Sequence, residues 1–98
     1  MKIYKSFVVA GFKYYGGFQV FDKLKAGKKL KLKLEEDNKY DDNAIEVYYK
    51  KVKLGYIPKY QNYSISQILK NGHNIFEAYV QMIDEKKNIV VAIVIKEK

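Results

Sequence analysis

The chain has 98 residues, of which 48% are apolar, and it carries a formal net charge of +8. This composition predicts one globular domain with one modest core and excludes a disordered chain. The absence of cysteine excludes disulfides and thiolate metal sites. The opening MKIYKSF lacks the apolar segment of a signal peptide, and the longest apolar run, residues 89–95, is far shorter than the about 20 residues of a membrane-spanning helix. We therefore expect a soluble, cytoplasmic protein with no membrane partner.

The positive charge is concentrated at one end of the sequence. All nineteen basic residues are lysines. Residues 1–33 hold nine of them and a single acid, Asp22, whereas lysines and acids balance over residues 34–98. Such a field favours nucleic acid, an anionic membrane surface or an acidic protein as partner. A lysine-rich surface that only maintains solubility would have the same composition.

The first third of the chain predicts a strand, a loop and a short helical segment. Residues 3–12 (IYKSFVVAGF) are rich in β-branched and aromatic side chains, which is typical of a strand. Residues 13–18 (KYYGGF) predict a loop, because the glycine pair permits positive φ. The apolar spacing over residues 19–25 allows one or two helical turns, and Gly27 suits their end.

Leucine and lysine alternate strictly over residues 29–34 (KLKLKL). This alternation predicts a strand with one apolar and one cationic face. The lysines are suited to follow phosphates along a nucleic acid. They are also typical of an edge strand protected against aggregation, or of a solvated face, and we prefer these explanations.

The remainder of the chain predicts four further strands and one helix. Residues 43–49 and 50–57 are expected to pair as a hairpin, and residues 60–73 have helical spacing. Residues 74–83 and 88–95 predict two strands, the second apolar on both faces and therefore central in the sheet. We expect a mostly β domain, a small barrel or strongly bent sheet with a helix packed alongside.

The segment 37–45 (DNKYDDNAI) places three aspartates within a basic protein. It does not match a calcium loop, because Lys39 occupies the third position and no glycine follows. The alternating residues 35–39 only faintly match the paired acids and lysine of a metal nuclease. We expect no metal and no cofactor, and we expect Asp42 and Asn43 to build the turn by bonding local backbone amides.

Four motifs occur in order along the chain: FVVAGFKYYGG (7–17), AGKKLKLKLEEDN (26–38), YDDNAIEV (40–47) and LGYIPKYQN (54–62). Together they resemble the HIRAN domain family, from about Phe7 to Leu69. The resemblance implies that residues 1–98 form a single HIRAN-like domain, an OB-like six-stranded β-barrel. The family occurs at the amino-terminal end of replication-fork remodelling helicases and as standalone bacterial and phage proteins. The resemblance therefore implies binding of single-stranded DNA, with a pocket for its free 3′-hydroxyl end.

The resemblance also implies contact residues, assigned motif by motif. In a DNA-binding member of the family, a basic residue and an aromatic residue follow the first strand, as Lys13 and Tyr14 do here. An aromatic–aspartate pair of the acidic turn corresponds to Tyr40 and Asp41. The expected nucleic-acid-binding residues are Lys13, Tyr14, Tyr15, Asn38, Tyr40, Asp41, Tyr56 and Lys59. That member has arginine at the position of Lys13, so here a point charge replaces a planar fork, and it has histidine at the position of Tyr56.

Lysines beside loop tyrosines suit single-stranded nucleic acid, because cations hold phosphates and aromatic faces stack on bases. With ten tyrosines in the chain, most must instead pack at the edge of the core. We expect Lys13 and Lys59 to hold phosphates. Tyr14 and Tyr40 would flank the terminal base or sugar. Asp41 would accept a hydrogen bond from the 3′-hydroxyl or from a base N–H.

The expected function is therefore non-enzymatic binding of a single-stranded DNA end in DNA repair or replication-fork processing. The domain would work alone or with a separately encoded helicase or nuclease. The alternative is a protein-interaction domain that docks an acidic partner through its basic half. A metal nuclease is a third hypothesis, and the single histidine, His73, has no partner for a catalytic triad.

Overall fold

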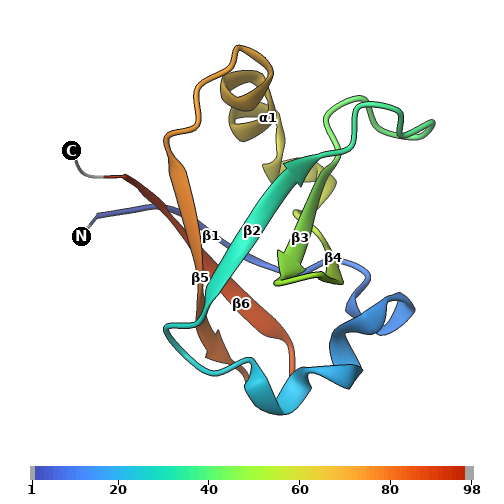
Figure 1. The fold of residues 1–98 in the computed structure, drawn as a ribbon, viewed down its shortest axis with the longest axis vertical. Coiled ribbons are helices and arrows are strands. Elements are labelled where there is room, and N and C mark those ends of the chain that lie inside the picture. Colours follow the sequence, from blue (N-terminus) through green and yellow to red (C-terminus); the bar gives the residue numbers. More distant parts are fainter. Residues whose placement is uncertain (1, 97–98) are drawn as a thin grey trace.

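A computed structural model describes residues 2–96 as one curled antiparallel β-sheet with one α-helix (Figure 1). The strands are β1 (Ile3–Val8), β2 (Lys29–Leu34), β3 (Ile45–Tyr49), β4 (Val52–Tyr56), β5 (Phe76–Ile83) and β6 (Ile89–Ile95). The α-helix is α1 (Tyr63–Lys70), and four short 3₁₀ helices lie in the connections: η1 (Phe12–Tyr14), η2 (Gly16–Gln19), η3 (Phe21–Lys23) and η4 (Lys59–Gln61). The predicted mostly β fold with six strands and a helix is confirmed.

The first connection differs from its prediction. The strand expected over residues 3–12 ends at Val8, and residues 12–23 form three successive 3₁₀ helices in place of a loop and a regular helical segment. Packing of the chain onto one aromatic ring explains the tight turns, because a Cβ atom at Gly17 would collide with the ring of Phe12. Figure 1 shows these turns at the end of the sheet opposite α1.

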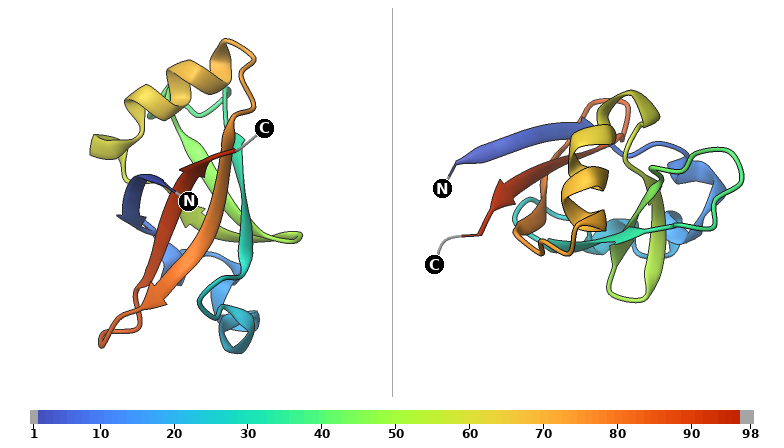
Figure 2. Two further views of the ribbon diagram at one scale, coloured as in Figure 1. Left: turned by 90° about the vertical axis from the view of Figure 1, so that its left-hand side faces the viewer. Right: turned by 90° about the horizontal axis from the view of Figure 1, so that it is seen from above.

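The sheet closes on itself through its two edge strands. The strand order is β1-β6-β5-β2-β3-β4, with every neighbouring pair antiparallel. Beyond β1, the backbone of Ala10 forms an isolated bridge with Tyr56 of β4, with N···O distances of 2.8 and 3.0 Å. This bridge fastens the curled sheet into an OB-like half-barrel (Figure 2). A turn after β1 is thereby placed beside the end of β4.

The positions of β6 and β2 in the sheet test two predictions. β6 pairs with both β1 and β5, and most of its side chains are buried, so its expected central position is confirmed. β2 pairs with β3 and, at its start, with β5, so the explanation of its lysines as protection of an edge strand is wrong for Lys29. Only Lys29 and Leu30 of β2 pair with β5, after which the two strands diverge.

The core lies inside the curl of the sheet. Ile45, Val47, Leu54 and Ile93 are fully buried there, and α1 adds the fully buried Ile65. These side chains hold the strands that carry the site in fixed positions, because packed interiors leave little room for rearrangement. No helix in residues 2–96 is long and apolar enough to cross a membrane.

Candidate nucleic-acid interface

Six of the eight predicted contact residues surround one open hollow with a volume of about 510 Å³, which we call the Tyr40 hollow. Its walls come from the turn between β2 and β3, from the chain on either side of η1 and from the end of β4 with the residues that follow. The lining residues are Ala10, Tyr15, Asn38, Tyr40, Asp41, Ala44, Tyr56, Ile57 and Lys59. Segments far apart in sequence meet here because the Ala10–Tyr56 bridge joins the edges of the sheet.

The turn that carries Tyr40 is braced from within. The Asn38 side-chain oxygen accepts hydrogen bonds from the backbone N–H groups of Tyr40, at 2.8 Å, and Asp41, at 2.9 Å. The Asn38 amide donates in turn to Glu35 at 2.6 Å. Tyr40 nevertheless remains 89% exposed. The structure thus holds a rigid backbone beneath a large aromatic side chain that contributes nothing to the core.

Both carboxylate oxygens of Asp41 already accept hydrogen bonds from the protein. Oδ1 accepts the backbone N–H of Asn43 at 2.9 Å, and Oδ2 accepts the side-chain amide of Asn62 at 2.8 Å. Asn62 is only 2% exposed. Two oxygens offer about four lone-pair sites. Asp41 therefore orders the turn and retains acceptor capacity toward the Tyr40 hollow.

The prediction that Asp42 and Asn43 build the turn is wrong. The turn is built by Asn38 and Asp41, whose oxygens accept the backbone amides. The Asn43 side-chain oxygen instead faces α1, where it accepts hydrogen bonds from Ser66, Gln67 and Lys70. Asp42 is exposed. The sequence alone does not distinguish a turn built by Asp42 and Asn43 from one built by Asn38 and Asp41. The position of α1 distinguishes them, because α1 supplies the donors that engage the Asn43 side chain.

Tyr56 belongs to a polar cluster beneath the Tyr40 hollow. Its hydroxyl donates to Glu35 at 2.6 Å and accepts from Lys53 at 2.8 Å, so it is engaged within the protein. Its ring meets Tyr15 edge to face at 5.8 Å, and the Lys53 ammonium lies 4.3 to 4.4 Å from both ring centres. Lys53 also pairs with the buried Glu46 at 3.1 Å. The one proton of the Tyr56 hydroxyl is therefore already donated within the protein.

This cluster fixes the protonation of its members. Burial and the hydrogen bond to Glu35 raise the pKa of Tyr56 to about 12. The hydrogen bond from Tyr56 lowers the pKa of Glu35 below its usual value. Burial disfavours the charge of Lys53, but its contacts with Tyr56 and Glu46 outweigh this and raise its pKa. At neutral pH the cluster therefore consists of a neutral tyrosine between a cation and a carboxylate.

The stability of the domain should depend on the protonation of Glu35. Because its pKa is lower in the folded than in the unfolded chain, its contribution is present above the ordinary value of 4.5 and is lost as the pH falls through the folded value. Urea unfolding between about pH 6 and pH 3 should therefore show a smaller loss of stability for Glu35→Gln than for the wild type. Glu36→Gln, at the exposed neighbouring position, is the matched control. Identical pH profiles for all three proteins would contradict this assignment.

Lys59 supplies the cation of the Tyr40 hollow. It is exposed, and its ammonium lies 3.4 Å from the backbone carbonyl of Tyr40. It begins η4, after Ile57 and Pro58 have carried the chain away from the end of β4. A long flexible side chain on a fixed backbone can reach a phosphate bound beside Tyr40.

Lys13 and Tyr14 do not line the Tyr40 hollow. They line a second one, of about 470 Å³, together with exposed Phe18 and with Lys86 and Lys87 from the β5–β6 turn. Tyr14 is 73% exposed, with the Lys13 ammonium 5.2 Å from its ring centre.

Gly11, which lines the second hollow, lies close to an aromatic ring of each: its φ is +75°, and an added Cβ would lie 3.4 Å from the Tyr15 ring and 3.8 Å from the Tyr14 ring. Lys86 and Lys87 were not predicted from the sequence to lie near Lys13. Their only signal was the adjacency of two lysines in a predicted turn, and nothing local links that turn to Lys13.

The acidic residues of the turn do not form a metal site in the described part of the chain. Within residues 2–96, no group of three or more His, Asp or Glu side chains is arranged to hold a metal ion. The polar groups of the Tyr40 hollow are instead backed by hydrogen bonds to amides. This arrangement is suited to binding through stacking, charge and hydrogen bonds.

The fold and this surface define a small OB-like β domain with aromatic and basic side chains around two hollows. The chain belongs to the HIRAN domain family, whose model matches residues 4–98, and HIRAN domains are known as nucleic-acid-binding domains. The match extends beyond the four sequence motifs to the last two strands. The predicted family is thus confirmed.

Two crystal structures resemble this one. A protein from Lactobacillus plantarum, a structural-genomics target, shares 29% identity with a TM-score of 0.82, covering 93% of this chain and 90% of that one. The HIRAN domain of human HLTF shares 21% identity with a TM-score of 0.76, covering 91% of this chain and 71% of that one. No curated protein matches the sequence. The second likeness supports the fold, and the contact residues remain predictions.

Proposed function

We propose that this domain captures single-stranded DNA by its free 3′-hydroxyl end, without catalysing a reaction. The terminal nucleotide occupies the Tyr40 hollow, where Tyr40 stacks on the base or sugar and Lys59 holds a phosphate. Tyr14, next to Gly11 at the second hollow, flanks the same terminal base or sugar, and Lys13 holds a phosphate beside it. The domain acts in DNA repair or replication-fork processing, alone or with a separately encoded helicase or nuclease.

The observation that carries this proposal is the setting of Tyr40. A tyrosine that is 89% exposed stands on a turn held by two hydrogen bonds to Asn38. It lines a hollow that also contains a cation and a carboxylate. Aromatic faces beside cations are the recurrent means of holding single-stranded nucleic acid, because every base offers a π-face.

The proposed preference for a strand end over a continuous strand rests on Asp41. A carboxylate repels the phosphates of a continuous backbone, whereas a terminal hydroxyl can donate a hydrogen bond to it. Asp41 lines the Tyr40 hollow and keeps acceptor capacity beyond its two hydrogen bonds within the protein. We therefore assign Asp41 to the 3′-hydroxyl.

Two substitutions test this division of roles. Lys13→Ala should weaken all single strands and flatten the dependence of affinity on salt, by about 0.7 in logarithmic slope for one lost phosphate contact. Asp41→Asn should chiefly erase the preference for a 3′-hydroxyl over a 3′-phosphate. Fluorescence anisotropy with short labelled oligonucleotides, at several salt concentrations, measures both effects.

Asparagine is the appropriate replacement at Asp41. Alanine would leave the buried Asn62 amide without its acceptor, which costs about 1–3 kcal/mol and confounds binding with folding. Asparagine preserves an oxygen for the Asn43 amide, and the Asn62 amide can turn over to accept. If Lys13→Ala and Asp41→Asn both reduce binding uniformly for every strand, the assigned roles are wrong.

A further inference from the structure

A second cationic region lies on β2 and the β3–β4 turn. Five lysines surround a shallow hollow of about 670 Å³ there, with only Leu30 and Tyr49 as the other lining residues. The five, which we call the lysine surface, are Lys28, Lys29, Lys31, Lys50 and Lys51. None of them lines either hollow of the proposed end site.

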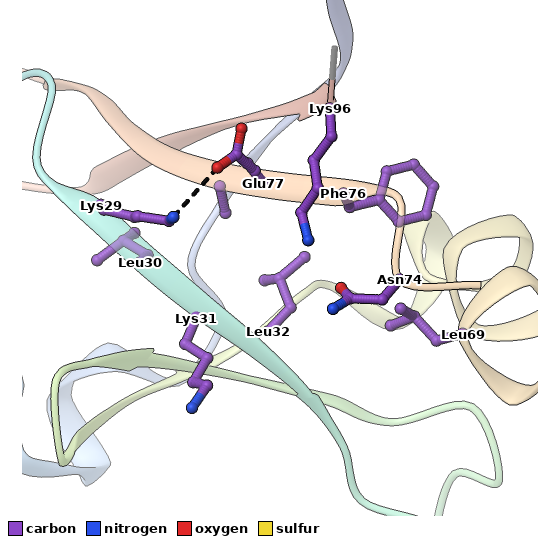
Figure 3. A pocket seen from close by; sticks show the side chains of 10 residues that line it. Lys29, Leu30, Lys31, Leu32, Leu69, Asn74, Phe76, Glu77 and Lys96 are labelled. Carbon is purple, nitrogen blue, oxygen red and sulfur yellow. Dashed lines mark ion pairs between the residues drawn. The ribbon is translucent and has the colours of Figure 1, made fainter. Parts of the chain in front are cut away.

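Most of this charge is uncompensated. Lys29 pairs with Glu77 of β5 at 3.1 Å. Figure 3 shows the Lys29 side chain directed toward Glu77, whereas Lys31 extends away from it. Within residues 2–96, no ion pair is formed by the other four lysines of the surface. Like charges gathered in this way repel each other, and a bound polyanion relieves the repulsion.

The contacts of these lysines within the fold are few: besides the Lys29–Glu77 pair, the Lys50 ammonium lies 5.5 Å from the ring centre of Tyr49. β2 lies between β3 and β5 in the sheet order, and Lys29 is in the stretch that pairs with β5, so Lys29 does not protect a sheet edge. Leu30, between Lys29 and Lys31, is buried and anchors the strand to the core. The chain reverses between β3 and β4 through Lys50, at φ 53°, and left-handed positions of this kind favour glycine or asparagine over lysine. The concentration of lysine is therefore not required by the backbone.

The lysine surface lies at the far end of β4 from the Tyr40 hollow. The turn with Lys50 and Lys51 precedes β4, and Tyr56 at the other end of this strand lines the hollow. At about 3.3 Å per residue the strand spans about 13 Å. A stacked nucleic-acid strand carries one phosphate per about 3.4 Å, so about four nucleotides cover this distance.

Exposed lysines also mark the route between the two regions. Lys33 on β2 is in register with Glu46 on β3, which is in register with Tyr56 on β4. Lys31, two residues earlier on β2, lies on the same exposed face. β2 thus leads from the lysine surface toward the turn that carries Tyr40.

We propose that the lysine surface is a second nucleic-acid site, which binds the phosphate backbone several nucleotides 5′ of the captured end. This second site rests on the proposed function for the identity of its ligand, single-stranded DNA. It adds to that function a contact that does not depend on base sequence. Lysine ammoniums are point charges without a preferred plane, which suits phosphates of any sequence. The small apolar floor of the hollow offers no pocket for a particular side chain or base.

The test varies the length of the strand and the chemistry of its end independently. Single strands of about 2 nucleotides, too short to reach the lysine surface from the Tyr40 hollow, and of about 16 nucleotides, each with a 3′-hydroxyl or a 3′-phosphate, are titrated with the wild type and with Lys31→Gln/Lys51→Gln. The wild type should bind the long strands more tightly than the short ones, whatever the end. The double variant should lose this gain, with a salt dependence for long strands flatter by about 1.4 in logarithmic slope for two lost contacts. Its affinity for short strands should remain that of the wild type.

Lys2→Gln/Lys23→Gln is the matched control. Both lysines are exposed and line none of the three hollows, and their replacement removes the same charge as the Lys31→Gln/Lys51→Gln variant. This control should retain the gain with length. Equal gains in the wild type and in Lys31→Gln/Lys51→Gln overturn the inference. The inference is also overturned if long DNA gives no gain in affinity while the protein binds phosphatidylserine vesicles or poly-glutamate. Binding to the vesicles would assign the lysine surface to a membrane, and binding to poly-glutamate would assign it to an acidic protein. A gain with length but no preference for the 3′-hydroxyl supports the lysine surface and overturns end capture alone.

Discussion

Replacement of Tyr40 by alanine should weaken binding of single-stranded DNA by about 5- to 150-fold, which corresponds to the about 1–3 kcal/mol of one stacked base. The loss should fall on affinity alone. Tyr40 is 89% exposed and its backbone is held by Asn38, so removal of the side chain leaves the fold intact. Fluorescence anisotropy with a short strand ending in a 3′-hydroxyl measures the affinity, and urea unfolding verifies the stability.

Tyr60 provides a matched control for this substitution. It is 87% exposed, lies directly after Lys59 and lines neither hollow. Tyr60→Ala should bind as the wild type does, and Tyr40→Phe should bind nearly as well because it keeps the ring. Equal losses for Tyr40→Ala and Tyr60→Ala would mean that exposed tyrosines contribute only non-specifically.

Replacement of Gly55 by alanine should destabilise the domain by about 3–5 kcal/mol, through backbone strain and overpacking together. Gly55 has φ +148°, a conformation that other residues rarely adopt. An added Cβ would collide with the carbonyl oxygen of Ala10 and lie 2.7 Å from a methyl group of Val9. The Ala10–Tyr56 bridge that joins the two edges of the sheet would have to shift. A loss of this size is a large part of the about 5–15 kcal/mol that stabilises a typical domain.

Substitution of Gly72 distinguishes the cost of backbone strain from the cost of overpacking. It has φ +83°, but an added Cβ would meet nothing within 4 Å. Gly72→Ala should therefore cost only the backbone strain, about 1–2 kcal/mol. Denaturant unfolding measures both variants. Similar losses at the two glycines would show that the close approach of Ala10 is unimportant for stability.

The strands and the helix could be predicted because their signals are local. The alternation of residues 29–34 and the helical spacing within residues 60–73 arise from the period of each element. Closure of the sheet has no such signal, because Ala10 and Tyr56 are 46 residues apart and their bridge is formed by backbone atoms. The expectation of an edge strand over residues 29–34 failed at Lys29 for the same reason, since pairing on both sides of a strand depends on partners elsewhere in the chain.

The candidate site was predicted in its membership but not in its arrangement. The family motifs indicated Tyr40 and Asp41, and both line one hollow. The sequence does not show that Lys13 lies in a separate hollow with Lys86 and Lys87, because only the folded chain brings the β5–β6 turn beside η1. It also does not show that Asp41 carries structural hydrogen bonds in addition to its proposed role. That double role depends on Asn62, which the fold buries against the turn.

The most direct test of end capture compares two strands of identical sequence, one ending in a 3′-hydroxyl and the other in a 3′-phosphate. Fluorescence anisotropy at one fixed salt concentration gives both affinities. The strand with the free hydroxyl should bind more tightly, because a terminal phosphate would meet the Asp41 carboxylate with like charge. Equal affinities, or tighter binding of the phosphorylated strand, would contradict capture of a 3′-hydroxyl end.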